Sequence, residues 1–153
     1  MENDEPRELE VGEFLLSTDK ARLDVDVVHR YLAFRSYWAK GIQRATVDRA
    51  VEHSFCAGVY LGDVQIGFGR VVTDRATYAY FCDIFLIEEY QRKGLGTELL
   101  KFLHESPALR GVRRWHLETE DEHAFYEKHG WTRTDGGGRW MEIVRPYGSV
   151  PRE

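Results

Sequence analysis

Apolar and polar positions divide the middle of the chain into three apolar runs, at residues 55–61, 64–73 and 77–87. Gly62-Asp63, between the first two runs, is a two-residue hairpin signal. Asp74-Arg75 separates the second run from the third. Because each run is rich in aromatic and β-branched residues, the pattern predicts three strands in an antiparallel meander.

The segment before the meander is predicted to supply one strand and two helices. Residues 13–16 form the strand, and Asp24 or Asp26 caps a helix whose shared face carries Val28, Tyr31, Leu32 and Arg35. Residues 36–41 are rich in aromatic side chains, and they either seal an edge of the core or line a pocket. Thr46 caps a second helix at 47–54. Residues 1–12 are acidic and are predicted to form a flexible, solvated tail.

The segment after the meander alternates between helix and strand. An apolar stripe predicts a helix at 96–104, which ends before Pro107. A strand at 112–118 follows this crossover and is therefore predicted to run parallel to the strand at 77–87. Thr119 and Glu122 form a capping box for a helix at 121–129, and Gly130 stops it. Strands at 131–134 and 139–144 form a closing hairpin.

The resulting order, β-α-α-β-β-β-α-β-α-β-β, predicts an α/β domain at residues 13–145, followed by a C-terminal tail at 146–153. Its sheet is mixed, mostly antiparallel and of about seven strands, with about four helices. A length of 153 residues with 42% hydrophobic residues fits one globular domain. A net charge of −5 provides no overall basic field for nucleic acid or an anionic membrane.

Cysteine usage and the chain ends indicate the compartment. Cys56 and Cys82 lie in apolar runs and form no Cys-x-x-Cys pair, as expected of free thiols in a reducing cytoplasm. The acidic N-terminus has no apolar core and is not a signal peptide, and no apolar run has the length of a membrane span. The six histidines show no metal-binding spacing. We therefore expect a cytoplasmic protein with no metal and no membrane contact.

The clearest candidate site is the stretch Gln91-Arg92-Lys93-Gly94-Leu95-Gly96-Thr97, which joins a strand to a helix. Its glycines allow close approach of the backbone to a ligand. A helix start also offers unpaired N–H groups and the positive end of the helix dipole. This turn therefore favours a phosphate or diphosphate. The spacing is not that of a P-loop, and it lacks the third glycine of a dinucleotide fingerprint.

The loop has the form Gln/Arg-x-x-Gly-x-Gly/Ala and resembles the diphosphate loop of the GCN5-related N-acetyltransferase (GNAT) family. Residues 124–131, Ala-Phe-Tyr-Glu-Lys-His-Gly-Trp, resemble a Phe/Leu-Tyr-x-x-x-Gly-Phe segment on the family's last helix, and the element order is also similar. The resemblance implies acetyl-coenzyme A as acetyl donor. It implies that main-chain groups of Ile84, Phe85 and Leu86 pair with the pantetheine arm. The implied diphosphate-binding amides are those of Arg92, Lys93, Gly94, Leu95, Gly96 and Thr97.

By the same resemblance, Tyr126 is the general acid, because a phenol with a pKa of about 10 can donate its proton to a departing thiolate. The alternative is a core-edge tyrosine with a satisfied hydroxyl. Asp83 lies in an apolar run, where it orients the acceptor amine, accepts its proton or bonds to a neighbouring strand. Glu118 is a weaker candidate base. Glu88 replaces a proline, and Thr119 an asparagine, found in many relatives.

The sequence therefore predicts an acetyl-coenzyme A-dependent N-acetyltransferase that uses direct transfer to a primary amine of a small molecule or peptide. Asp83, with the aromatic Tyr37 and Trp38, would suit a cationic or aromatic amine. We expect a monomer or homodimer that binds no nucleic acid. The alternative functions are a non-catalytic acyl-coenzyme A sensor or partner-interaction module, and a nucleotide-binding domain.

Overall fold

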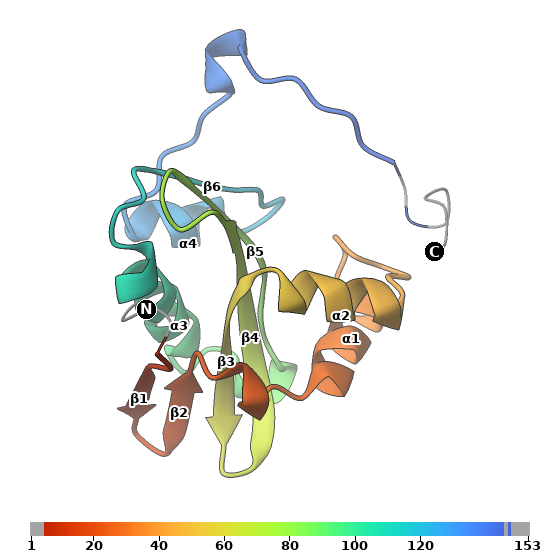
Figure 1. Ribbon diagram of the computed structural model, residues 1–153, viewed down its shortest axis with the longest axis vertical. Helices are drawn as coiled ribbons and strands as arrows, with labels where there is room; N and C mark the ends of the chain where they lie inside the picture. Colours follow the sequence, from red (N-terminus) through yellow and green to blue (C-terminus); the bar gives the residue numbers. More distant parts are fainter. Residues whose placement is uncertain (1–4, 146, 148–153) are drawn as a thin grey trace. The chain divides into compact units, whose positions relative to one another are not determined.

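A six-stranded sheet in the order β1-β2-β3-β4-β5-β6 organises the fold in the computed structural model, which describes residues 5–145 and 147 (Figure 1). Its strands are β1 Glu8–Val11, β2 Phe14–Ser17, β3 Phe55–Leu61, β4 Val64–Thr73, β5 Tyr78–Leu86 and β6 Arg114–Leu117. Neighbouring strands are antiparallel except β5 and β6, which are parallel as predicted. The α/β class with a mixed, mostly antiparallel sheet is confirmed.

Four α-helices lie in the described part of the chain, as expected: α1 Val25–Phe34, α2 Arg44–Glu52, α3 Leu95–His104 and α4 His123–Lys128. Short 3-10 turns are η2 Lys20–Arg22, η3 Glu88–Tyr90, η4 Pro107–Leu109 and η5 Gly136–Gly138. The chain divides into two compact units, residues 1–117 and 118–153.

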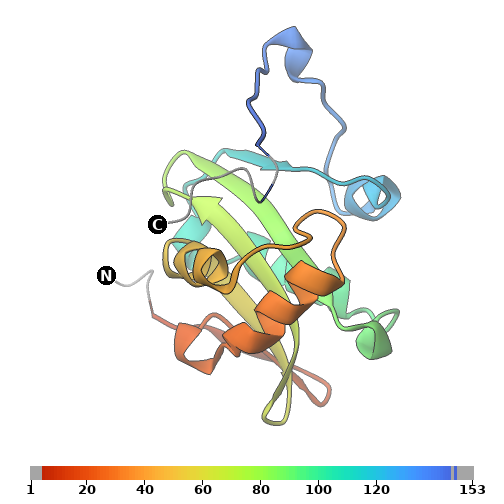
Figure 2. The ribbon, with the colours of Figure 1, turned by 90° about the vertical axis from the view of Figure 1, so that its right-hand side faces the viewer.

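In the first unit, α1 and α2 cover one face of the sheet, which Figure 2 views from the helix side, and α3 covers the other. Val28 of α1 belongs to a buried cluster with Phe68 of β4 and Phe85 of β5. On the opposite face, a Cβ added to Gly69 of β4 would lie 2.7 Å from Leu103 of α3. The sheet is therefore the middle layer of this unit, with apolar contacts on both sides.

Of the helix caps predicted for α1 and α2, the first is confirmed and the second is wrong. Asp24 caps α1, since its side chain accepts two backbone N–H groups at 3.1 and 3.4 Å. The prediction that Thr46 caps α2 is wrong, because α2 begins at Arg44 and its N-cap, Gln43, makes no side-chain hydrogen bond. Arg44 instead binds Asp48 one turn later at 3.0 Å, a pairing that supports the first turn.

β1 corrects the expectation of a flexible tail for residues 8–11, which pair with β2. Arg7 anchors the strand, because its Nη1 donates to the main-chain oxygen of Phe102 at 2.8 Å and its guanidinium lies 4.5 Å from the ring centroid of Phe102. Its backbone N–H donates to Thr18 Oγ1 at 2.8 Å. These contacts join residues far apart in sequence. Residues 1–4 lie outside the described residues.

The second unit is described from residue 118 to 145 and at 147, and its helix is α4. Thr119 Oγ1 accepts the N–H of Glu122 at 3.1 Å, as a capping box requires, but α4 begins only at His123. Gly130 follows the helix with φ of +94°, which confirms it as the stop.

The predicted closing hairpin is wrong for the described residues. Residues 131–134 and 139–144 form no strand, and the intervening glycines form η5. A run with strand-like composition forms a strand only where a neighbouring strand takes its backbone hydrogen bonds. The predicted tail at 146–153 lies outside the described residues except for Tyr147.

Candidate active site

β5 extends past its parallel neighbour. β6 ends at Leu117, opposite Phe81, whereas β5 continues to Leu86. Residues 82–86 therefore have β4 on one side and, among the described residues, no strand on the other. Such an edge presents main-chain N–H and C=O groups with which an extended ligand can pair. The opening includes the predicted pantetheine-binding residues Ile84, Phe85 and Leu86.

The open edge begins at a β-bulge. Phe85 pairs with Phe68 of β4, but the next pair joins Cys82 to Arg70, so β5 has one more residue than β4 in this interval. Asp83, in the longer interval, has φ of +52°, a conformation that is uncommon outside glycine. A bulge bends its strand and re-aims side chains, and bulges are frequent beside active sites.

Two donors hold the Asp83 carboxylate. Arg70 Nε donates to Oδ2 at 2.7 Å, and Trp38 Nε1 donates to Oδ1 at 2.9 Å. The side chains of Arg70 and Asp83 are only 18% and 8% exposed. Burial lowers the pKa of Arg70, but the charge of Asp83 and its hydrogen bond outweigh burial, so the pKa lies above its usual value. Asp83 therefore bonds to the neighbouring strand, one of the three alternatives that the sequence left open.

Trp38 comes from the aromatic connection at residues 36–41, between α1 and α2. Ser36 and Ala39 in this connection are buried, whereas Tyr37 and Trp38 are 47% and 40% exposed. The two exposed rings meet edge to face with centroids 5.1 Å apart. The connection therefore both seals the core and presents an aromatic surface next to Asp83.

The glycine loop has the geometry of an anion site. α3 begins after Gly94, and no side chain caps this end of the helix. Positive φ angles of +63° at Arg92 and +81° at Gly94 turn the backbone into the helix. Leu95, Gly96 and Thr97 occupy the first turn, where the helix offers no acceptor for their N–H groups and its dipole favours an anion.

Side chains of the loop tie it to the sheet and leave two cations in solvent. Gln91 Nε2 donates to the main-chain oxygen of Leu86 at 2.9 Å, so that this carbonyl is already paired. The Leu95 side chain is buried, and those of Arg92 and Lys93 are exposed. The residues predicted for cofactor binding therefore lie on one strand end and the loop that follows it.

α1 supports the open edge from one face of the sheet. The rings of Tyr31 and Phe85 are stacked, with centroids 3.9 Å apart and planes 5° apart. Burial, followed by the charge of Glu88, raises the pKa of Tyr31. Arg35 Nη1 binds Glu88 Oε1 at 2.9 Å, so the residue that replaces the family's proline connects η3 to α1.

Tyr126 and Glu118 belong to the second unit. Tyr126 lies on α4 with its ring centroid 5.2 Å from that of Phe125 and 6.2 Å from that of Trp131. Its main-chain oxygen accepts the N–H of Trp131 at 3.2 Å. The roles of Tyr126 as acid and Glu118 as base stay predictions.

Both cysteines are free thiols, as predicted. Burial raises the pKa of Cys56 and of Cys82 to about 12. The thiolate is the nucleophilic form of cysteine, so neither side chain is activated near neutral pH.

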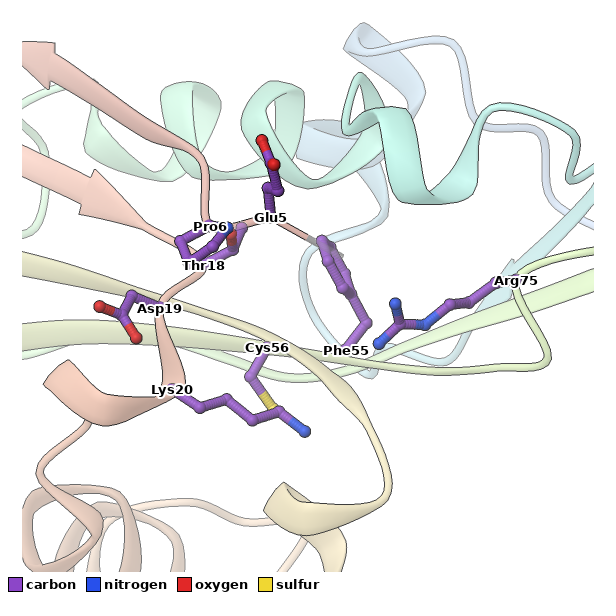
Figure 3. Close-up of a pocket in the computed structure, with 8 residues that line it drawn as sticks. All are labelled: Glu5, Pro6, Thr18, Asp19, Lys20, Phe55, Cys56 and Arg75. Atoms are coloured by element: carbon purple, nitrogen blue, oxygen red, sulfur yellow. The ribbon is translucent and has the colours of Figure 1, made fainter. Parts of the chain in front are cut away.

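A hollow of about 450 Å³ lies elsewhere in the first unit, and Figure 3 shows its walls. It is lined by Glu5, Pro6, Thr18, Asp19, Lys20, Phe55, Cys56 and Arg75. Two of its charged groups are already engaged: Lys20 Nζ donates to the Glu52 main-chain oxygen at 3.0 Å, and Asp19 accepts the N–H of Ala21. None of the predicted cofactor residues lines this hollow.

The described part of the chain contains neither a membrane-spanning helix nor a metal-binding cluster. None of its helices combines the length and apolar character needed to cross a membrane. No three of its His, Cys, Asp or Glu side chains gather in a metal-binding arrangement.

Comparison with known proteins identifies the family. Residues 36–133 match the acetyltransferase (GNAT) domain. A Gibberella zeae protein named as a candidate acetyltransferase is 30% identical in an alignment of length 140 that covers 77% of this chain and 78% of that protein. The crystal structure of a candidate GNAT acetyltransferase from Xanthomonas campestris pv. campestris is 36% identical, with a TM-score of 0.85 over 90% of this chain and 96% of that one.

The chain therefore belongs to the GNAT family of N-acetyltransferases, in which acetyl-coenzyme A is the acetyl donor. A GNAT acetyltransferase from Elizabethkingia anophelis, solved with acetyl-coenzyme A bound, shares the fold with a TM-score of 0.62 at 16% identity. The structural match covers 90% of this chain and 92% of the Elizabethkingia anophelis chain.

Sequence reasoning missed two residues at the open edge, Arg70 and Tyr31. Arg70 is a charge inside an apolar run, as Asp83 is in the next run. Opposite charges in two strands joined by a short turn are a signal for a cross-strand pair. The stacking of Tyr31 on Phe85 left no comparable signal, because it depends on where α1 crosses the sheet.

Proposed function

We propose that this enzyme transfers acetyl directly from acetyl-coenzyme A to a primary amine of a small molecule or peptide. One observation carries the proposal: the open edge of β5 leads, through η3 and the loop, to a helix N-terminus that no side chain caps. An extended amide-containing arm suits the edge, and a diphosphate suits the helix end. Pantetheine and diphosphate occur in that order in coenzyme A.

The chain would hold this donor mainly with main-chain atoms. Ile84 and Leu86 would pair with the pantetheine arm, Leu86 through its N–H because its carbonyl is taken by Gln91. The main-chain groups of Phe85, between them, are directed to β4. The amides of residues 92–97 would bind the diphosphate, with the exposed Arg92 and Lys93 adding positive charge. Side-chain substitutions in the loop should therefore matter less than changes to its backbone conformation.

In the transfer step, the neutral amine attacks the thioester carbonyl carbon, the C–N bond forms and the C–S bond breaks. We assign Tyr126 as the acid that gives its phenolic proton to the departing thiolate. The attacking nitrogen loses one proton to water, from which the phenolate regains its own. An ordinary phenol is protonated at neutral pH and can therefore act as an acid.

The two thiols support direct transfer over an acyl-enzyme. A cysteine must ionise to accept an acetyl group, and burial raises the pKa of Cys82, the one nearer the open edge, to about 12. Kinetics with two substrates should therefore show a ternary complex, with lines that intersect and are not parallel.

The acceptor side favours an aromatic framework over a cation. Both carboxylate oxygens of Asp83 already accept hydrogen bonds, and its charge is paired with Arg70. Tyr37 and Trp38, in contrast, present exposed rings at the same place. Such rings stack with aromatic groups and contribute about 0.5–1.5 kcal/mol beyond their buried area.

Thiol release from acetyl-coenzyme A, measured with a panel of amines, tests the function. The panel pairs benzylamines and phenethylamines with spermidine and a lysine peptide, and mass spectrometry confirms each acetylated product. Turnover of any amine with its acetylated product supports the proposal. Tight coenzyme A binding, measured by calorimetry, without any acetylated product would instead favour a sensor.

Tyr126→Phe tests the acid. Loss of general acid catalysis should lower kcat about a hundredfold or more, with the KM for acetyl-coenzyme A little changed. Tyr60→Phe is the matched control, because it removes a buried hydroxyl of β3 that is outside the proposed machinery. Equal rates for Tyr126→Phe and wild type would refute the assignment. Cytoplasmic location and the monomer or homodimer stay predictions.

A further inference from the structure

We propose that Arg70 is a positioning residue for the cofactor edge: it holds Asp83 in the bulge of β5, and the bulge aims the main-chain groups that follow. The inference rests on the proposed binding of acetyl-coenzyme A along residues 84–86. Arg70 itself would not touch the cofactor.

The bulge needs support because its conformation is unfavourable. Asp83 has φ of +52°, a region in which an L-residue with a Cβ is strained. Two side chains from different elements compensate, Arg70 from β4 and Trp38 from the connection between α1 and α2. Each takes a separate oxygen of the carboxylate, so the side chain is fixed in direction as well as in place.

Arg70 is suited to this task by its position and its forked shape. It lies directly opposite Cys82, at the start of the bulge. Its Nη1 donates to Ser54 Oγ at 3.0 Å, while its Nε binds Asp83. Because Ser54 is buried between α2 and β3, the guanidinium is anchored on the far side from the carboxylate. A lysine carries its donors on a single nitrogen and lacks the planar fork that places two donors in fixed directions.

The hydrogen bond between Arg70 and Asp83 lies among packed side chains, where there is no room for a substrate. The cavity that Arg70 and Asp83 line together with α1 and α2 is only about 10 Å³, no more than a single water needs. Asp83 is therefore held within the layer between sheet and helices. Its influence on a ligand must pass through the strand backbone.

The bulge affects the residues that follow it because successive residues of a β-strand point their side chains to opposite faces of the sheet. Phe81 lies against His104 of α3, and Ile84 lies near Gly69 on the same face, three residues further on. In a regular strand, side chains on the same face are an even number of positions apart. A spacing of three positions therefore requires one inserted residue. Without the bulge, residues 84–86 would slip by one position, which would exchange the faces of their side chains and the directions of their main-chain groups.

Glycine at position 83 provides a decisive test, because it adopts a positive φ without strain and needs no partner. The variants are Arg70→Met, and the doubles Arg70→Met with Asp83→Gly and Arg70→Met with Asp83→Ala. Both doubles remove the two buried charges together, which avoids leaving one unpaired. Coenzyme A affinity is measured by calorimetry, and folding by circular dichroism.

Arg70→Met should weaken coenzyme A binding about tenfold to a hundredfold, as expected for a misplacement of about 1 Å. It should raise the KM for acetyl-coenzyme A more than it lowers kcat. The glycine double should bind within about threefold of wild type, whereas the alanine double should stay weak. Arg44→Met, which breaks exposed ion pairs of α2, is the control and should bind normally.

Wild-type affinity in Arg70→Met, or equal affinities in the two doubles, would overturn the inference while leaving the proposed function intact. If Arg70→Met fails to fold, the comparison of the doubles decides alone. Failure of the wild-type chain to bind coenzyme A would remove the proposed function and this inference with it.

Discussion

Gly94 allows the loop geometry to be tested with a single methyl group. Its φ of +81° lies in the left-handed region, and a Cβ built there would have no heavy atom within 4 Å. Gly94→Ala therefore introduces no clash. Any loss of stability must come from the backbone conformation that the loop requires.

The size of this loss can be worked out. A left-handed conformation costs an L-residue about 1–2 kcal/mol. For a domain of this length, that lowers Tm by about 2–8 °C. Gly94→Asn should lose less, since the short amide side chain tolerates this region. Gly111→Ala is the matched control: its Cβ also meets open space, but its φ is not left-handed, so the change should be neutral or stabilise by up to about 1 kcal/mol.

Urea denaturation followed by circular dichroism measures the free energy of unfolding, and calorimetry measures coenzyme A affinity on the same samples. We expect Gly94→Ala to lose stability and affinity, and Gly111→Ala to lose neither. The reasoning is refuted if Gly94→Ala unfolds at the same urea concentration as wild type while the control behaves as expected.

Three further predictions use other parts of the first unit. Tyr60→Phe should stabilise the protein in urea by up to about 1–3 kcal/mol, because the buried hydroxyl has no hydrogen-bond partner among the described residues; a loss of stability would contradict this. Arg7→Met should destabilise by about 1–3 kcal/mol, since it removes a charged hydrogen bond to the Phe102 carbonyl, and unchanged unfolding would count against this anchor. Burial raises the pKa of Cys82 from 9.0 to about 12, so the protonated thiol favours the folded state: its contribution is complete below pH 9.0 and is lost as the pH rises towards 12. Cys82→Ala should therefore flatten the alkaline fall in stability measured by urea, and an unchanged slope would oppose this account.

The meander could be predicted because local signals and strand pairing agree there. β3 and β4 have the predicted bounds, and α3 starts one residue before the predicted position 96. β4 follows β3 through the short turn at Gly62-Asp63, so their pairing is local in the sequence. The helix N-terminus could be expected on the same basis, whereas the open edge of β5 could be expected only from the resemblance to the GNAT family.

Features that depend on distant partners could not be predicted. The bulge at Asp83 arises from the register of two strands, which no single run reveals. Arg7 binds Phe102 across 95 positions, so acidic composition alone suggested a tail where a strand forms. Residues 139–144 show the converse, because an apolar-rich run after a glycine turn predicts a strand for which the described residues provide no partner. A pattern specifies which residues share a face, but a partner decides whether the strand forms.

Donor binding and proton transfer are assigned to different stretches of the chain. Substitutions in the two stretches should therefore affect different quantities, affinity in one and rate in the other. The residues that would bind the donor lie at 84–97, in the first unit, and they act mainly through main-chain atoms. Tyr126 lies in the second unit and would act through its hydroxyl. A change at position 126 does not alter the N–H groups at the start of α3, so Tyr126→Phe should lower the rate without weakening coenzyme A binding. Gly94→Ala changes those N–H groups and leaves the phenol in place, so its losses should appear first in affinity. If one substitution removed affinity and the proton-transfer step together, the same side chain would have to serve both, and the assignment of binding to the backbone would be wrong.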